Sequence, residues 1–159
     1  MIYIVVGTQK FQFNRLLKQI DEFVVDGTIR DIVFAQVGYS DYKPVHYKYT
    51  DFLGKEEFNA HIEKCDLLIT HSGVGTIMAG LKNSKPVIAV PRLAKYEEHV
   101  DDHQVQIANS FAIKNYILIC NETCNLGKLI SEAKVHKFDK YISQKDNAIK
   151  TIREYICSI

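Results

Sequence analysis

The sequence has no marked excess of charge and no long apolar run. Lys and Arg number 20 against 19 Asp and Glu, a formal net charge of +1, whereas nucleic-acid-binding domains usually carry a basic excess or stripe. No apolar stretch approaches the roughly 20 residues that span a bilayer. The first residues lack the basic region and the small-residue cleavage site of a signal peptide. We therefore expect a cytoplasmic protein that binds no nucleic acid.

Cysteine is scarce, with four in 159 residues. Cys120 and Cys124 form a lone pair without a second pair nearby, and a structural metal site needs about four ligands. Because cytosolic thiols stay reduced, we expect Cys65, Cys120, Cys124 and Cys157 to be thiols.

Other metal-binding patterns are also missing. His99 and His103 would share a helix face, but Val100 stands where a zincin has glutamate, and no third ligand is evident. No Asp-x-Asp motif is present to chelate a metal-bound diphosphate. We expect no metal site.

Hydrophobic residues make up 47% of the chain, enough for the core of one domain spanning residues 1–159. Short apolar runs predict strands at 2–6, 31–37, 66–70, 86–90 and 116–119. Helical spacing predicts helices at 11–25, 56–64, 76–82, 101–112 and 143–159. The tyrosine-rich segment 41–53 is interpreted as a loop plus a short strand. This alternation predicts an α/β fold, a Rossmann-like parallel sheet with helices on both faces.

Small and polar residues follow several predicted strands, at the sheet edge where such folds bind ligands. They are Gly7-Thr8-Gln9, Gln36-Val37-Gly38, and the turn from His71 to Thr76, which contains Ser72, Gly73 and Gly75. A helix that begins after a glycine turn presents free N–H groups to a phosphate. The turn is either such a diphosphate cradle or simply a tight connection. It is neither a Walker A loop nor a full dinucleotide-binding fingerprint.

The ordered segments 71–81, 85–92 and 98–104, with Gly7-Thr8-Gln9 before them, resemble the C-terminal domain of family 28 glycosyltransferases, the MurG-like group. The resemblance implies the donor-binding C-terminal half of a GT-B enzyme. Stand-alone halves of this kind include the eukaryotic dolichol-pathway N-acetylglucosamine transferase subunit and bacterial capsule and exopolysaccharide subunits of the PssE type. The run from Val90 to Gln104 looks most like the bacterial group.

The resemblance implies inverting, metal-independent transfer from a UDP-sugar to a lipid-linked saccharide acceptor at the inner face of the membrane. A membrane-anchored partner subunit would bind the acceptor. Gly7, Thr8, Gln9 and Arg92 are expected at the site. Gln36 and Gly38 would flank the base, residues 71–76 would hold the diphosphate, and His103 and Gln104 would bind the sugar.

The general base is left open by the resemblance, since MurG-like enzymes are thought to carry it in the other half. Glu98 and His99 are the local candidates, and either could instead belong to a solvated loop. Ala79 stands where the family has a ribose-binding glutamate, which favours an alternative role as a non-catalytic, partner-stabilising subunit. An epimerase of this architecture would need a second domain.

Overall fold

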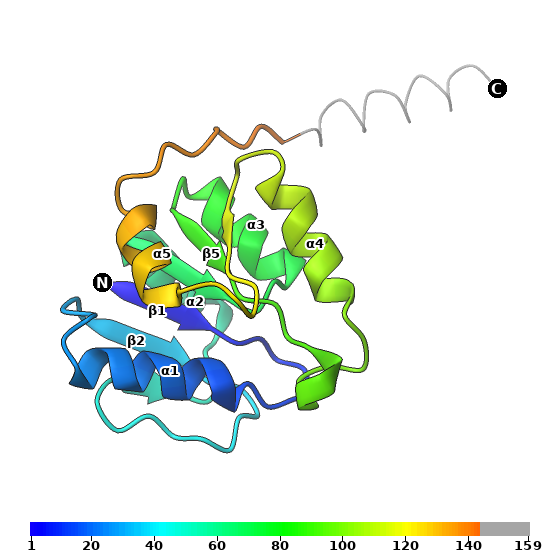
Figure 1. The fold of residues 1–159 in the computed structure, drawn as a ribbon. Helices are drawn as coiled ribbons and strands as arrows, with labels where there is room; N and C mark the ends of the chain where they lie inside the picture. Colours follow the sequence, from blue (N-terminus) through cyan, green and yellow to red (C-terminus); the bar gives the residue numbers. More distant parts are fainter. Residues whose placement is uncertain (144–159) are drawn as a thin grey trace.

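The structure, a computed structural model, describes residues 1–143. Among these residues, all strands run parallel in one six-stranded sheet with the order β3-β2-β1-β4-β5-β6 (Figure 1). The strands are β1 (Ile2–Val5), β2 (Val33–Gln36), β3 (Lys48–Thr50), β4 (Leu67–Thr70), β5 (Val87–Ala89) and β6 (Leu118–Ile119). This is the strand order of a doubly wound Rossmann sheet, whose direction of winding reverses between β1 and β4. The predicted fold class is confirmed.

Helices cover both faces of the sheet, as predicted. They are α1 (Asn14–Val25), α2 (Lys55–Lys64), α3 (Val74–Lys82), α4 (His103–Ala112) and α5 (Leu126–Ala133), with a 3₁₀ turn η1 (Ala94–Tyr96) before α4. Buried side chains of α1 and α5 share one core cluster, and those of α2, α3 and α4 share the other. None of these helices within residues 1–143 is long and apolar enough to cross a bilayer.

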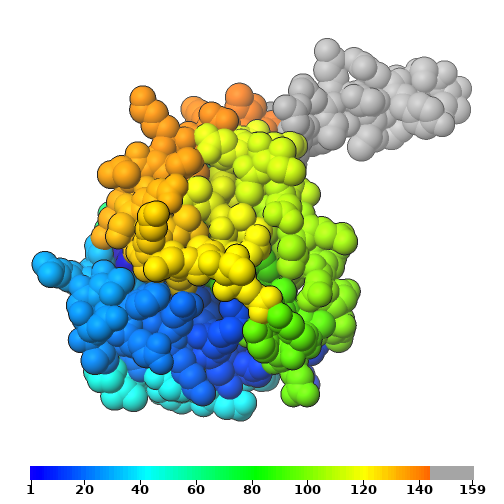
Figure 2. All heavy atoms as spheres, in the orientation of Figure 1, coloured from blue at the N-terminus to red at the C-terminus, as the bar shows by residue number. Residues whose placement is uncertain are grey.

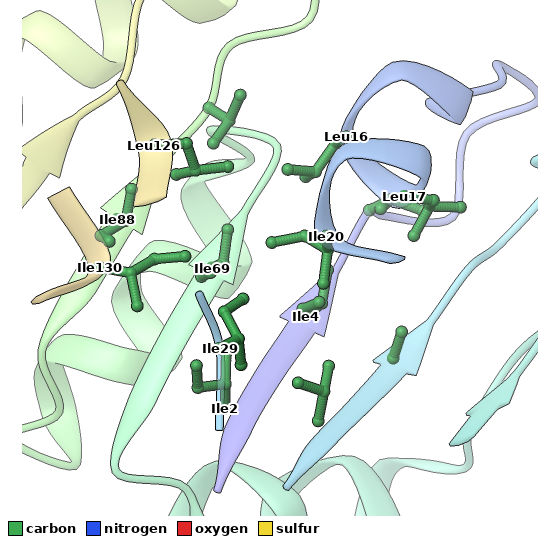
Figure 3. Packing of buried hydrophobic residues seen from close by; sticks show 14 of the residues in the cluster. Ile2, Ile4, Leu16, Leu17, Ile20, Ile29, Ile69, Ile88, Leu126 and Ile130 are labelled. Carbon is green, nitrogen blue, oxygen red and sulfur yellow. The ribbon is translucent and has the colours of Figure 1, made fainter. Parts of the chain in front are cut away.

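Strand β1 shows how the sequence builds two cores at once. Successive side chains of a strand point to opposite faces. Ile2 and Ile4 therefore enter the cluster under α1 and α5, while Tyr3 and Val5 enter the opposite cluster. All four are buried, which explains why the strand is a continuous apolar run rather than an alternating one. Figure 3 shows Ile4 packed among side chains from α1 and the neighbouring strands.

Helix α5 was not predicted from the sequence. Asn125 caps it, because its Oδ1 accepts a hydrogen bond of 2.9 Å from the Lys128 amide. Leu126 and Ile130 then point into the same core as α1 (Figure 3). The predicted helix at 143–159 lies almost wholly outside the described residues.

The expectation of reduced thiols is wrong for one pair, because a disulfide joins Cys120 and Cys124. Cys120 follows β6, and the Cys124 amide donates to the Asn121 carbonyl at 3.0 Å. This turn brings the two Cα atoms to 5.2 Å, within the range that a disulfide spans. Cys65 is a buried free thiol, and Cys157 lies outside the described residues.

Candidate functional site

A cavity of about 700 Å³ opens at the carboxyl edge of the sheet. The ends of β1, β2 and β4 form its floor, and the first turns of α2, α3 and α4 form its walls. Its lining is Val5, Gly7, Thr8, Gln9, Gln36, Leu53, Lys55, Phe58, His71, Ser72, Gly73, Val74, Gly75, Thr76, His99, His103, Gln104 and Ile107. The cavity thus straddles the point where the sheet reverses its winding, the usual ligand position in this fold.

His71 lies at the centre of this floor, between two glycines. A Cβ atom on Gly7 would fall 2.6 Å from the His71 Nε2 atom, and one on Gly73 would fall 2.4 Å from it. Gly7 also has φ +88°, a conformation that favours glycine. Both positions therefore need glycine so that the imidazole can fit.

The electrostatics of His71 follow from its burial. Burial, and then the Arg92 guanidinium, lower the pKa of His71 to about 4. Its Nδ1 lies 3.2 Å from the Val5 carbonyl oxygen, which can only accept. The neutral ring therefore carries its proton on Nδ1, and Nε2 presents a lone pair between the two glycines.

Helix α3 begins at the cavity wall. Its N-cap is Gly73, and no side chain caps this end. The Ser72 side chain before it is fully buried, and its hydroxyl has no hydrogen-bond partner among the described residues. Because the first amides of a helix lack partners within it, Val74 and Gly75 give the cavity an anion-binding wall.

Gln104 lines the cavity from the first turn of α4. Its Oε1 accepts from the Arg92 amide at 3.2 Å, which fixes the orientation of the side-chain amide. The amide nitrogen has no partner among residues 1–143. The side chain can therefore donate to a ligand hydroxyl. His103 lines the cavity beside it, and its backbone amide donates to Asp101 Oδ1 at 3.0 Å.

Arg92 does not line the cavity. It is fully buried, and its Nη2 donates to the carbonyl oxygens of Val6 at 2.5 Å and Phe11 at 3.1 Å. The side chain therefore supports the loop after β1 from behind. Gly38 also lies outside the lining: a Cβ there would come within 2.6 Å of the Gly7 carbonyl oxygen. Both residues shape the first loop and are not in position to contact a ligand.

Glu98 is also absent from the lining, so its position does not support the expected role as a base. Its side chain is 1% exposed and forms a two-pronged ion pair with Arg15, with Nε–Oε1 and Nη2–Oε2 distances of 2.9 Å. The Leu93 amide also donates to it, at 3.0 Å. Glu98 fastens the segment after β5 to α1. Figure 2 shows this green segment packed against the dark-blue N-terminal part.

His99 does reach the cavity. Its Nε2 lies 3.1 Å from Gln9 Oε1, and its Nδ1 lies 3.1 Å from Asp101 Oδ1. The Phe11 ring packs against it with a centroid separation of 5.3 Å. Of the two candidate bases, only His99 lines the cavity.

Three further lining residues, Leu53, Lys55 and Phe58, were missed from the sequence. They belong to the start of α2 and the turn before it. Their position depends on β3, whose three residues pair with β2 at the edge of the sheet. A short strand is expected within segment 41–53, but only its parallel pairing with β2 places the residues that follow it at the same edge.

The donor set of the site offers little to a metal ion. No Asp or Glu lines the cavity among the described residues. Nor does any group of three or more His, Cys, Asp and Glu side chains within residues 1–143 have an arrangement that could hold a metal. Metal independence stays a prediction.

Residues 1–156 match the glycosyltransferase family 28 C-terminal domain. The chain belongs to this family. The expected resemblance is thus confirmed, and the chain is a glycosyltransferase-type domain. The order of its strands and the cavity at their carboxyl edge agree with that assignment.

Curated relatives include the UDP-N-acetylglucosamine--N-acetylmuramyl-(pentapeptide) pyrophosphoryl-undecaprenol N-acetylglucosamine transferase of Prochlorococcus marinus. It is 29% identical over 136 residues, which are 83% of this chain and 36% of the relative. The UDP-N-acetylglucosamine transferase subunit ALG13 of Yarrowia lipolytica is 32% identical over 92 residues, 57% of this chain and 41% of the relative. The matched part thus spans well under half of either relative.

Solved structures show the same fold. Acinetobacter baumannii MurG superposes with a TM-score of 0.53 at 17% identity, over 82% of this chain and 39% of that one. The solution structure of ALG13 superposes with a TM-score of 0.56 at 20% identity, over 89% of each chain. The sheet is therefore that of a GT-B C-terminal domain.

Proposed function

We propose that this chain is the donor-binding subunit of an inverting glycosyltransferase that moves a sugar from a UDP-sugar to a lipid-linked saccharide acceptor. The observation that carries the proposal is the cavity at the reversal point of the sheet, with His71, its two glycines and the uncapped start of α3 on one wall. The names of several relatives specify UDP-N-acetylglucosamine transfer, which supports a UDP-sugar donor.

We propose a place for each part of the donor. The diphosphate would lie on the start of α3, where the amides of Val74 and Gly75 and the macrodipole stabilise the charge that the leaving UDP gains. The sugar would extend toward α4, within reach of His103 and the amide nitrogen of Gln104. The nucleoside would extend the other way, past Gln36 toward α2.

In the proposed reaction an acceptor hydroxyl attacks the anomeric carbon. The carbon–oxygen bond to the β-phosphate breaks, and UDP leaves with the bonding electrons. His99 would take the proton of the attacking hydroxyl on Nε2, which lies at the cavity 3.1 Å from Gln9 Oε1. This role requires the Gln9 side-chain amide to turn so that its oxygen no longer accepts a hydrogen bond from Nε2. A base within hydrogen-bond reach of the nucleophile is the first requirement for this role.

The proposed acceptor would be brought by a partner subunit. The ALG13 relatives are named as subunits, which supports a two-part enzyme. We propose that the chain works in the cytoplasm and is recruited to the inner face of the membrane by a membrane-anchored, acceptor-binding partner. Synthesis of capsule or exopolysaccharide is the proposed setting.

A transfer assay tests this function. Membranes from cells that express the chain are incubated with a radiolabelled UDP-sugar panel, and the organic extract is counted for lipid-linked product. We expect one UDP-sugar to label the extract, and His99→Ala to reduce labelling at least about a hundredfold, the lower end of what a general base contributes. Labelling unchanged in cells that lack the chain would contradict the proposal.

A non-catalytic, partner-stabilising role is favoured by one observation. Ala79 packs beside the core on α3 and does not line the cavity, and no carboxylate of the described residues lines it. If that role is the true one, His99→Ala will leave transfer unchanged while deletion of the chain abolishes it.

A further inference from the structure

The cavity has an uneven charge distribution. Among the described residues that line it, Lys55 is the one side chain that is permanently charged, and none is acidic. His71 is neutral because burial lowers its pKa to about 4. Lys55 is therefore the main fixed side-chain charge that a ligand meets in this part of the chain.

The Lys55 amine has no competing partner. It forms no ion pair or hydrogen bond with any described residue. Glu57 lies in the same helical turn, and its Oε2 accepts instead from the Gly54 amide at 3.4 Å. Lys55 is exposed and can move to meet a ligand group.

The position of Lys55 along the sheet edge separates it from the diphosphate wall. It follows β3, whereas His71 and α3 follow β4, and the strand order places β2 and β1 between them. Three strand spacings amount to about 14 Å. A ligand with its diphosphate on α3 would therefore bring its nucleoside, not its phosphates, toward Lys55.

The surroundings of Lys55 suit an aromatic base. Leu53 and Phe58 line the same end of the cavity, and both are half-buried. Apolar and aromatic side chains of this kind pack against the faces of a planar ring. Lys55 and Gln36 then supply polar contacts at the rim of the ring.

We propose that Lys55 recognises the base: its ammonium donates a hydrogen bond to O4 of uracil and so selects a pyrimidine with a carbonyl at C4 over one with an amino group there. Lysine is a donor only. Cytosine presents an amino group, also a donor, where uracil presents O4, so CDP would leave the ammonium unpaired. The inference rests on the proposed function, since it assumes that a nucleoside diphosphate occupies the cavity.

Calorimetric titration of the whole chain with UDP, CDP and inorganic pyrophosphate tests the assignment. We expect the wild type to bind UDP about tenfold more tightly than CDP, the worth of one charge-assisted hydrogen bond. Lys55→Met should remove most of that preference by weakening UDP. Pyrophosphate affinity should change less than about twofold. Lys64→Met, which removes the same charge from the exposed far end of α2, is the control and should behave as wild type.

The outcomes separate this inference from the proposed function. Equal losses for UDP, CDP and pyrophosphate in Lys55→Met would show that Lys55 binds phosphate and would overturn the inference. An unchanged preference for UDP would overturn it as well. Wild-type protein that binds neither nucleotide would contradict the proposed function itself.

Discussion

His71 and Gly73 fit together so closely that a Cβ atom on Gly73 would lie 2.4 Å from the His71 Nε2 atom. Gly73→Ala should therefore push the imidazole out of place and disturb its contact with the Val5 carbonyl oxygen. We expect a loss of about 1–3 kcal/mol in the free energy of unfolding, the usual cost of overpacking, and at least tenfold weaker UDP binding. Urea denaturation and calorimetry measure the two effects.

Gly75→Ala is the matched control for this prediction. A Cβ there would meet no described atom within 4 Å, so the free energy of unfolding should change little. If Gly73→Ala proves as stable as Gly75→Ala, His71 is not held in the way the structure shows.

Glu98 should matter for stability. Glu98→Gln replaces one carboxylate oxygen by an NH2 group, which then faces an N–H donor of Arg15 or Leu93. Because breaking a buried charge pair is costly, we expect a loss of about 2–4 kcal/mol in the free energy of unfolding. The same change at the exposed neighbour Glu97 is the control and should cost under about 0.5 kcal/mol. A stable Glu98→Gln protein that binds UDP but has lost transfer would instead support a catalytic role.

The low pKa of His71 predicts a pH-dependent stability. The buried, neutral ring titrates near pH 4 when folded, against an ordinary value of 6.5. Between these values the unfolded chain binds more protons, so folding loses stability as pH falls. This group alone should account for about 3 kcal/mol between pH 7 and pH 4.

Urea midpoints measured from pH 7 to pH 4.5 check this effect. His71→Asn, which keeps a donor near the Val5 carbonyl, should show a flatter dependence than wild type over that range. Parallel curves for the two proteins would show that His71 is not the group responsible.

Gln104 should matter more for transfer than for nucleotide binding. The side chain lies on α4, on the side of the cavity where the sugar would extend, and UDP lacks that sugar. Gln104→Ala should lower transfer at least tenfold and UDP affinity less than about threefold. Gln106→Ala, an exposed change on the same helix, should alter neither. Equal losses of transfer and UDP affinity would show that Gln104 acts by anchoring the Arg92 amide.

The sequence predicts much of this architecture, because short local patterns mark the buried strands and the glycine turn at the cavity. Continuous apolar runs mark buried strands such as β1 and β4, and the glycine turn after β4 marks the cavity wall. The short β3 falls in segment 41–53, where a strand is expected, but two of its three side chains are exposed. No local pattern shows that it pairs with β2, and this pairing is what brings Lys55 and Phe58 to the cavity. The burial of Glu98 depends on Arg15, which lies 83 positions earlier in the chain, and no local pattern reveals such a pairing.

The disulfide, too, cannot be predicted from a local sequence pattern. Cys120 and Cys124 are close in sequence, but only the turn after β6 decides whether their side chains meet. Helix α5 was overlooked although its cap, Asn125, and its apolar positions are local features. An N-cap residue and helical spacing of apolar positions both mark this helix in the sequence.

Calorimetric titration of the purified chain with UDP, in buffer with EDTA and in buffer with Mg²⁺, tests the central claim most directly. The account predicts saturable binding of one UDP per chain with the same affinity in both buffers. Gly75→Val should bind UDP at least tenfold more weakly, because the added side chain would project into the space that the diphosphate needs. Binding that disappears in EDTA would contradict the metal-free site, and no binding in either buffer would contradict the assignment of the cavity to a nucleotide-sugar.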